Sequence, residues 1–341
     1  MRRRRHILVL RFSAIGDVAI AAPLMREYAA RNPDVRFTFV SNGRLKPLFE
    51  GVKNLHFHSV DFKNEHKGIK GLIKLYRELT RLKPTAVADF HGVLRSLFLD
   101  ALFALAFIKV RVIYKGRREK ALLTRRTGKV LKPLKSSMSR YESVLCRVGL
   151  DSINFAEAKI SQAPLRENEE FKIGIAPFAK HKGKMWPYEK MEEVIDYLSR
   201  DEGVKVFLFG GGKDEVNALM AWQHKFPGVE SVAGKYDFEE ELQIMSKMDL
   251  MVTMDSANMH LASHVGVPVI SVWGATHPYA GFTAWGQKES YTVQYDISCR
   301  PCSVFGNKKC FRGDYACLNN ITSEMVIDKI DEFRESLQKL K

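Results

Sequence analysis

The sequence predicts an α/β fold built from two similar parallel-sheet domains. Short apolar runs of the length of a buried strand alternate with longer stretches whose apolar residues recur at helical spacing. Strands that alternate with helices form parallel sheets covered on both faces. The alternation stops at residues 151–170, a polar stretch with little periodicity, and then begins again. Because 341 residues are also many for one core, we expect two domains, 1–155 and 170–341, joined by a linker.

In the first half, a buried strand at residues 7–11 is followed by a loop and a helical pattern at 17–32. Residues 115–140 later interrupt the rhythm, because they carry ten Lys/Arg and one Glu. The remaining elements expected in this half are strands at 36–41, 55–61, 86–90 and 110–114, and helices at 68–83, 93–107 and 139–149.

The second half repeats the alternation and ends in an amphipathic helix at residues 322–340. The sequence leaves open whether this helix packs back on the first domain. The other elements expected are strands at 171–178, 204–210, 231–233, 250–254 and 267–273, and helices at 187–200, 214–226, 238–247 and 257–265.

The charge balance points to an acidic partner. The formal net charge is +15, which suits a phosphate-rich ligand, an anionic membrane surface or nucleic acid. The apolar run at 7–10, behind the N-terminal arginines, is too short for a signal peptide. The longest other apolar run, 97–108, is interrupted by Asp100 and is too short to span a bilayer. We therefore expect a cytosolic protein that can touch a membrane.

The stretch from 250 to 278 has the strongest signature of a ligand site. Asp255 and Ser256 directly follow a predicted buried strand, and both residue types cap helices through a side-chain oxygen. The N–H groups that begin the next helix, at 257–259, lie at a positive helix end suited to phosphate. His260, one turn further along, can face the same crevice. The alternative is an ordinary buried βαβ unit with a capping aspartate.

Two further polar stretches also follow predicted strands. Residues 11–17 read RFSAIGD, in which Gly16 permits a tight turn and Asp17 follows it. Residues 176–187 read APFAKHKGKMWP, and their cationic side chains could hold phosphate. The alternatives are that Asp17 only caps its helix and that the lysine-rich loop is only solvated. The glycine-rich run at 210–215 is weak evidence by itself.

These stretches resemble glycosyltransferase family 9, the ADP-heptose:lipopolysaccharide heptosyltransferases. The first stretch matches the family's Arg-x-Ser/Thr-x-Ile/Leu-Gly-Asp, and residues 184–187 match its Lys-x-Trp-Pro. Ala257 departs from the pattern, which has glycine there. The third match covers Asp255, Ser256, His260, Leu261, Ala262, Gly266, Pro268, Gly274, Thr276 and Pro278.

The resemblance implies the GT-B fold, in which two Rossmann-like domains face each other across a cleft. It also implies an inverting, metal-independent transfer of heptose from ADP-heptose to the lipopolysaccharide inner core, either Kdo–lipid A or a heptosylated core. Asp17 would be the base that takes the proton of the acceptor hydroxyl, and Lys184 would offset charge on the departing diphosphate. The implied donor-binding residues are Ser13, Gly16, Lys180, Lys184, Glu215, Asp255, Ser256, Ala257 and His260.

Residues 89–96, DFHGVLRS, resemble the acceptor-side motif of this family, and Arg95 could bind an anionic sugar. The basic stretch 115–140 could bind the acceptor or the inner-membrane surface, which implies a cytoplasmic protein peripheral to that membrane. The alternatives are a surface arginine and a solvated loop. The arginines expected to contact the acceptor from this stretch are Arg117, Arg118, Arg125 and Arg126.

Four of the five cysteines cluster near the C-terminus, as Cys299, Cys302, Cys310 and Cys317. The first pair has the spacing of zinc ligands, so a structural zinc ion and free thiols both stay open. By resemblance, no cofactor or metal is required for catalysis.

Two rival functions remain at this stage. One is a GT-B transferase or epimerase that uses another nucleotide sugar, and the other is a basic nucleic-acid-binding protein. The sequence has no basic helix with interleaved aromatic residues, so we expect no nucleic-acid partner.

Overall fold

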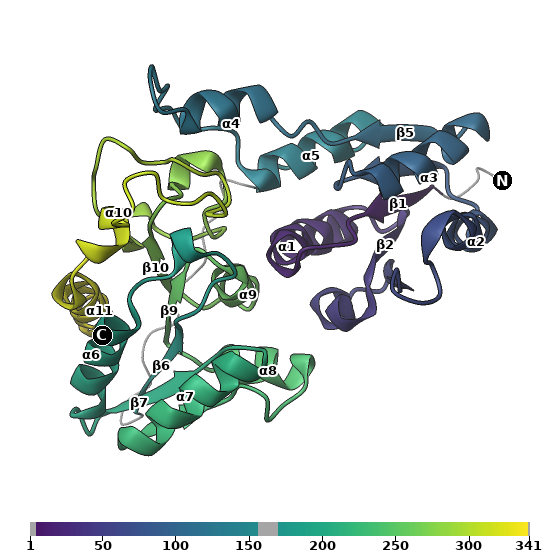
Figure 1. The fold of residues 1–341 in the computed structure, drawn as a ribbon. Helices are drawn as coiled ribbons and strands as arrows, with labels where there is room; N and C mark the ends of the chain where they lie inside the picture. Colours follow the sequence, from purple (N-terminus) through teal and green to yellow (C-terminus); the bar gives the residue numbers. More distant parts are fainter. Residues whose placement is uncertain (1–4, 156–169, 340–341) are drawn as a thin grey trace. The chain divides into compact units, whose positions relative to one another are not determined.

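The computed structural model describes residues 5–155 and 170–339 (Figure 1), and the linker predicted at 151–170 lies mostly outside the described residues. The chain divides into two compact units. Unit 1 comprises Met1–Lys115 and Lys135–Ala158, and unit 2 comprises Gly116–Leu134 and Lys159–Lys341. Each unit contains a parallel sheet, as the alternation of strands and helices predicts.

The sheet of unit 1 has five parallel strands in the order β3-β2-β1-β4-β5. The central strand is wholly buried, because helices cover both faces. In its register, Leu8 pairs with Thr38 on one side and with Val87 on the other. The strands are β1 (His6–Leu10), β2 (Arg36–Asn42), β3 (Leu55–Val60), β4 (Ala86–Asp89) and β5 (Lys109–Val112).

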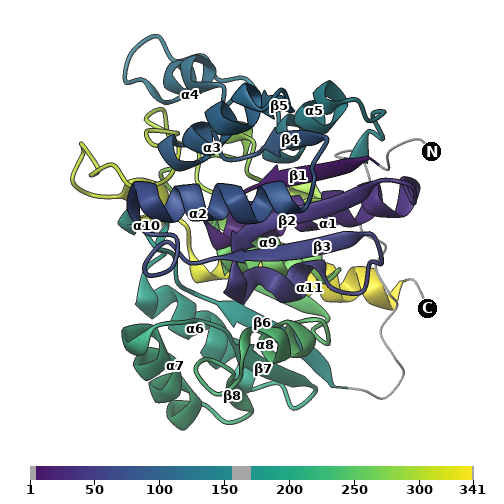
Figure 2. The same ribbon diagram turned by 90° about the vertical axis from the view of Figure 1, so that its right-hand side faces the viewer.

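The helices of unit 1 form two layers. Helices α1 (Ile15–Arg31) and α5 (Ser137–Val148) pack against each other. Helices α2 (Gly68–Arg81) and α3 (Leu94–Leu105) lie side by side on the other face of the sheet (Figure 2). The connections between parallel strands are right-handed crossovers. The chain moves across the sheet in one direction from β1 to β3 and in the opposite direction from β3 to β5, so the connecting helices lie on opposite faces. A short 3-10 helix, η1 (Gly43–Phe49), joins β2 to β3.

Unit 2 has a six-stranded parallel sheet in the order β11-β10-β9-β6-β7-β8. The strands are β6 (Phe171–Ala176), β7 (Val204–Leu208), β8 (Val229–Ser231), β9 (Leu250–Met254), β10 (Val269–Trp273) and β11 (Thr292–Gln294). The helices are α6 (Tyr188–Ser199), α7 (Lys213–Lys225), α8 (Phe238–Met245), α9 (Ala257–His264), α10 (Ala316–Asn319) and α11 (Ser323–Gln338). Short 3-10 helices are η3 (Lys182–Lys184), η4 (Pro278–Ala280) and η5 (Glu289–Tyr291).

The final helix, α11, is part of the core of unit 2. It packs against α6 and β10, and the ring of Phe333 lies 6.3 Å from that of Phe171 and 5.7 Å from that of Tyr291. The sequence did not indicate which domain this amphipathic helix packs against. In the structure its apolar residues Val326, Ile330, Phe333 and Leu337 are buried in unit 2.

The basic segment Gly116–Leu134 packs within unit 2, although the sequence places it in the first domain. It contains α4 (Arg117–Thr124), a helix that the charge-rich sequence does not suggest. Lys129 Nζ donates to the carbonyl oxygens of Cys299, at 2.8 Å, and Pro301, at 3.0 Å. The N–H of Leu134 donates to the carbonyl of Tyr279 at 2.9 Å. The segment therefore belongs to unit 2 and adds no strand to the sheet of unit 1. This is why the alternation of strands and helices stops there in the sequence.

The expected strands and long helices are present, with ends displaced by a few residues. The elements missed are α10, β11 and the 3-10 helices, which are too short to show a periodic pattern, and α4, whose sequence is rich in charge. Within 5–155 and 170–339, no helix is both long enough and apolar enough to cross a bilayer.

We predict that Lys129→Ala lowers the thermal stability of unit 2. Hydrogen bonds that involve a charged group contribute about 1.5–3 kcal/mol each, and the variant leaves two carbonyl groups without this donor. Thermal unfolding monitored by circular dichroism should give a lower Tm. Lys132→Ala, at an exposed position of the same segment, is the control and should leave Tm unchanged. Equal Tm values for the two variants would contradict the role assigned to Lys129.

Candidate functional site

Each sheet reverses its strand order at one point, and the loops with the strongest family motifs begin there. In unit 1 the reversal falls between β1 and β4, and in unit 2 it falls between β6 and β9. Loops that leave adjacent parallel strands in opposite directions open a crevice at the carboxyl edge, which is where such sheets bind ligands. The two stretches that match the family in unit 1 follow β1 and β4, and those in unit 2 follow β6 and β9.

Asp17 is held by an ion pair rather than by a helix-capping bond. Its Oδ2 pairs with a guanidinium nitrogen of Arg11, and a second guanidinium nitrogen donates to the carbonyl of Phe90 at 2.9 Å. The N-cap of α1 is Ala14, which has no capping side chain. Asp17 stays 28% exposed, so its carboxylate is oriented and still accessible to a ligand. Ser13 is exposed beside it, and Gly16 has ordinary helical geometry in the first turn of α1.

His91 lies beside the same ion pair and is uncharged at neutral pH. Burial and the positive charge of Arg11 lower the pKa of His91 to about 3. Its Nδ1 accepts the N–H of Phe12 at 3.3 Å. The proton of the neutral ring is therefore on Nε2, which makes His91 a neutral donor next to a carboxylate.

Asp89 shapes the turn that presents His91. Its carboxylate accepts the N–H groups of His91, at 2.6 Å, and Gly92, at 2.9 Å, together with the hydroxyl of Ser96 at 2.7 Å. Asp100, on the buried side of α3, lies near it. Burial and the neighbouring Asp89 carboxylate raise the pKa of Asp100 to about 9. Asp100 is therefore a neutral acid at neutral pH, which spares the core a second negative charge.

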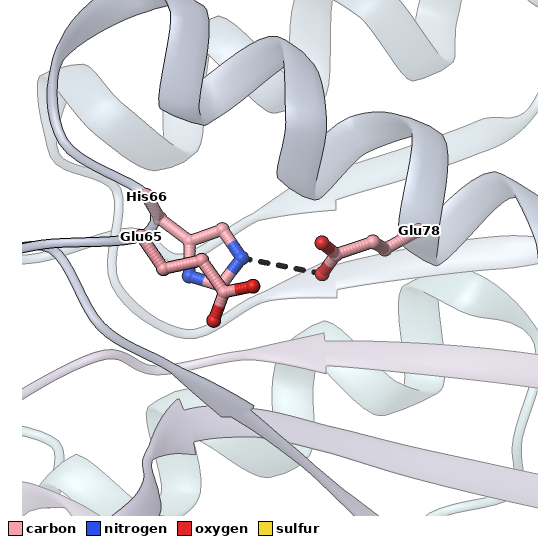
Figure 3. Close-up of side chains that lie close together, drawn as sticks. All are labelled: Glu65, His66 and Glu78. Carbon is pink, nitrogen blue, oxygen red and sulfur yellow. Dashed lines mark hydrogen bonds and ion pairs between the residues drawn. The ribbon is translucent and has the colours of Figure 1, made fainter.

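Arg95 stands on the first turn of α3, with its guanidinium 4.9 Å from the ring centre of Phe62. Phe62 also packs on Phe12, at 4.9 Å between ring centres. The loop that carries Phe62 is anchored by His66, whose Nε2 lies 3.2 Å from Glu78 Oε2. Figure 3 shows these two side chains pointing toward each other, with Glu65 beside them.

Glu65, His66 and Glu78 are the one group of three potential metal ligands that converges within the described residues. His66 Nδ1 accepts the N–H of Asp61 at 3.0 Å. The ring proton is therefore on Nε2, where a metal would need a lone pair. Glu65 is also occupied, because it pairs with Lys74 at 2.6 Å. The group is a hydrogen-bonded anchor for the Phe62 loop and does not fit a metal.

In unit 2, the structure brings Lys184 and Asp255 together. Lys184 Nζ lies 2.8 Å from Asp255 Oδ2, with the side chains 16% and 4% exposed. The capping role expected for Asp255 is therefore wrong, because its carboxylate is turned toward the lysine of the neighbouring loop. The pair connects the loops that leave β6 and β9, the two strands at the reversal.

Ser256 is the N-cap of α9, but its side chain makes no capping bond, contrary to expectation. Within the described part of the chain, its buried Oγ has no hydrogen-bond partner. Ala257 begins the helix, and its φ is not positive, so alanine fits where the family pattern has glycine. His260 is buried one turn further along. The start of α9 therefore offers N–H groups and a hydroxyl close to Lys184.

The cysteine-containing loop supports Lys184. The N–H of Gly183 donates to the carbonyl of Gly306 at 3.2 Å, and a Cβ at Gly306 would lie 2.6 Å from Lys184 Cγ. The cysteine-containing loop therefore lies beside Lys184, one of the predicted donor-binding residues. The four cysteines are free thiols, and no three of them converge as metal ligands. A zinc ion there stays a prediction that this arrangement does not support.

Sequence reasoning missed Arg300, which is buried in the same loop. Its guanidinium donates to the carbonyls of Gly274, at 2.5 Å, and Thr276, at 3.0 Å. Arg300 therefore fixes the loop after β10. Its position between Cys299 and Pro301 gives no periodic signal, so only the tertiary contacts reveal it.

Two other predicted donor residues are Lys180 and Glu215. Lys180 is exposed, and Glu215 Oε2 accepts the N–H of Gly211 at 2.8 Å, which closes the glycine-rich loop on itself. Beside that loop is a small hollow. It is lined by Phe209, Gly210, Phe238, Glu241, Leu242, Met245, Asn258 and Leu261.

Two parallel-sheet units, each with charged side chains gathered where strand order reverses, define the class of α/β proteins that bind nucleotides at such an edge. The chain belongs to glycosyltransferase family 9 (heptosyltransferase), whose sequence profile matches residues 74–310. The protein is therefore a glycosyltransferase, as the motifs predict.

Curated relatives and solved structures agree with this assignment. The lipopolysaccharide core heptosyltransferase OpsX of Haemophilus influenzae is 24% identical over 293 residues, which cover 80% of each chain. Lipooligosaccharide heptosyltransferase 2 of Campylobacter jejuni is 22% identical and covers 93% of this chain and 95% of its own. A family 9 glycosyltransferase from Veillonella parvula has a similar fold, with a TM-score of 0.75, 20% identity and 99% coverage of both chains. E. coli heptosyltransferase WaaC with ADP-2-deoxy-2-fluoro heptose has a TM-score of 0.64 at 18% identity, over 96% of this chain and 99% of its own.

We predict that Asp100→Asn increases stability more at pH 8 than at pH 5. Above its ordinary pKa of 3.8, the Asp100 carboxyl loses its proton in the unfolded chain, but it keeps the proton in the folded chain up to about pH 9. Its contribution to stability is therefore lost progressively as pH rises through this window. Asparagine does not titrate, so the Tm difference between variant and parent should grow with pH. Asp34→Asn, at an exposed position, is the control, and a difference independent of pH would contradict the prediction.

Proposed function

We propose that this chain transfers a heptose from ADP-heptose to the lipopolysaccharide inner core, with Kdo–lipid A or a heptosylated core as acceptor. Membership of family 9 supports the reaction type. The relatives named as lipopolysaccharide and lipooligosaccharide heptosyltransferases support the pathway. The complexes of WaaC with ADP and with a fluorinated ADP-heptose support the donor.

The observation that carries the proposal is the pairing of Lys184 with Asp255 beside the start of α9. A diphosphate there would meet a lysine cation, the first N–H groups of a helix and the unpartnered hydroxyl of Ser256, which together suit two negative phosphates. The small hollow beside Gly210 also borders α9 through Asn258 and Leu261, and the adenine ring is proposed to lie next to it. The remaining residues proposed to line the donor site are Lys180, Glu215, Ala257 and His260.

The transfer is a direct displacement with inversion. Asp17 accepts the proton of the acceptor hydroxyl while that oxygen attacks the anomeric carbon of the heptose. The bond between that carbon and the ADP oxygen breaks, and ADP departs with the electron pair. Lys184 offsets the charge that builds on the leaving diphosphate, so the proposed reaction uses no metal and no cofactor, and the cysteines take no part in it.

Arg11 orients the base in this mechanism. Because it pairs with Asp17 through one nitrogen and with the Phe90 carbonyl through another, the carboxylate has a fixed direction. Neutral His91 adds an Nε2–H donor that can hold a sugar hydroxyl without competing for the proton. Ser13 and Gly16, between Arg11 and Asp17, line the same loop.

The acceptor is anionic, and exposed arginines of both units are proposed to bind it. Arg95 lies on the acceptor-side motif, and Arg117 and Arg118 are exposed on α4. Arg125 and Arg126 follow that helix, with the Arg126 guanidinium 4.4 Å from the ring centre of Phe311. Because such an acceptor is embedded in lipid, we propose a cytoplasmic protein peripheral to the inner membrane.

We predict that Asp17→Asn retains ADP affinity but lowers kcat at least ~100-fold, which is the usual reach of a general base. Asparagine keeps the size of the side chain but cannot accept the proton. Single-turnover transfer to purified acceptor, read by product mass, measures the loss. Asp34→Asn makes the same chemical change at an exposed site of unit 1 and should keep parental kcat. Near-parental turnover of Asp17→Asn would exclude Asp17 as the base.

We predict that Lys184→Ala weakens ADP binding by about ten- to a hundredfold and Ser256→Ala by about tenfold or less. A charge-assisted contact contributes ~1.5–3 kcal/mol and a neutral one ~0.5–1.5 kcal/mol. His260→Ala should lie between them if its imidazole bonds a phosphate oxygen, and should instead lower Tm if it serves the core. Calorimetric titration with ADP separates these results.

The ion pair requires a matched control, since Lys184→Ala leaves the buried Asp255 carboxylate without its cation. The double variant Lys184→Ala/Asp255→Asn removes that cost. It should recover Tm but not ADP affinity if the lysine contacts the donor. Recovery of both would mean that Lys184 serves only the fold, and the donor site would then lie elsewhere.

A further inference from the structure

The outward side of α3 is apolar, which is unusual for a helix on the surface of a sheet. Its inward side buries Ser96, Leu99, Asp100 and Phe103. On the opposite side, Leu94 is 87% exposed and Leu105 is 77% exposed. Phe107, directly after the helix, is 99% exposed. A helix that is apolar all round is normally buried on all sides, so this one lacks a partner for one face within the described residues.

The neighbouring helix, α2, presents a row of cations beside this apolar face. The two helices are joined by the rings of Tyr76 and Phe103, 5.0 Å apart between centres. Because α2 and α3 lie side by side (Figure 2), the α2–α3 surface carries both exposed apolar and exposed basic side chains. Its exposed members are Ile69, Lys70, Lys74, Arg77 and Arg81 on α2, Leu94, Leu97 and Leu105 on α3, and Phe107 after it.

Two carboxylates near this surface are already engaged. Glu65 is paired with Lys74 at 2.6 Å. Glu78 accepts from the Nε2 atoms of His58 and His66, each at 3.2 Å. The surface therefore combines exposed apolar side chains with an excess of positive charge.

We propose that the α2–α3 surface docks unit 1 on an anionic phospholipid bilayer. Apolar side chains that enter the headgroup region, flanked by lysine and arginine at the level of the phosphates, are the physical requirements for interfacial binding. A second copy of the chain fits less well, because a two-fold contact would bring the basic rows of both copies together. The inference rests on the proposed membrane association and is independent of the proposed chemistry.

The test measures binding of the full chain to vesicles of phosphatidylcholine with and without phosphatidylglycerol, by co-sedimentation. The parent should bind the vesicles that contain phosphatidylglycerol. Leu105→Ser/Phe107→Ser should reduce that binding about tenfold or more, because two exposed apolar anchors are lost. Lys70→Gln/Arg77→Gln/Arg81→Gln should reduce it by a similar factor and make the remainder insensitive to salt.

Two matched variants make the result specific. Met220→Ser/Tyr236→Ser changes two exposed apolar residues of unit 2 and should bind as the parent does. Arg117→Ser/Arg118→Ser removes exposed cations of α4 and should retain most vesicle binding. ADP affinity should be parental in the α2–α3 variants, so failure of this proposal is distinguishable from failure of the donor site.

Three results would overturn the proposal. One is parental vesicle binding by both α2–α3 variants, and another is loss of binding only with the α4 variant. The third is self-association of the parent that Leu105→Ser/Phe107→Ser abolishes without a change in vesicle binding, which would assign the surface to a second copy. Since all substituted side chains are exposed, a far-UV spectrum and Tm equal to those of the parent should confirm that the variants fold.

Discussion

The polarity of the parallel strands is the constraint on which the rest of this structure depends. All strands of a sheet end at the same edge, and the order of strands reverses once in each unit. At that reversal the loops diverge, so side chains far apart in sequence meet there. In unit 1 this brings Arg11 and Asp17 next to His91, and in unit 2 it brings Lys184 to Asp255. The chemistry proposed for the chain is a consequence of this arrangement of strand ends.

The excess of positive charge serves several physical purposes. Lys184 pairs with a buried carboxylate and is proposed to meet the donor, while Lys129 and Arg300 fix loops through carbonyl groups. Exposed cations, such as Arg117 on α4 and Lys70 on α2, are available to a large acidic partner such as a membrane surface. Net charge therefore predicts that such a partner exists, but the location of each cation decides which ones can contact it.

The sequence by itself determined the alternation of strands and helices, the two-domain organisation and the family. These features are local, because the apolar pattern that predicts a strand or a helix lies within a window of about five to fifteen residues. The motif at 11–17 and the lysine at 184 could also be found this way, since their chemistry depends on short spacings after a strand. The sequence also predicted strand β9 and the start of helix α9 at the correct residues, because both depend on a short local pattern.

Only the tertiary structure decided what those residues contact. Asp255 was expected to cap α9, yet it pairs with Lys184. The basic segment 116–134 was expected in the first domain, but its contacts are with unit 2. Gly306 and Arg300 support loops of the proposed donor site, and no sequence pattern predicted these contacts. The reason is that these interactions join segments separated by tens to hundreds of residues, and periodicity carries no information about such partners.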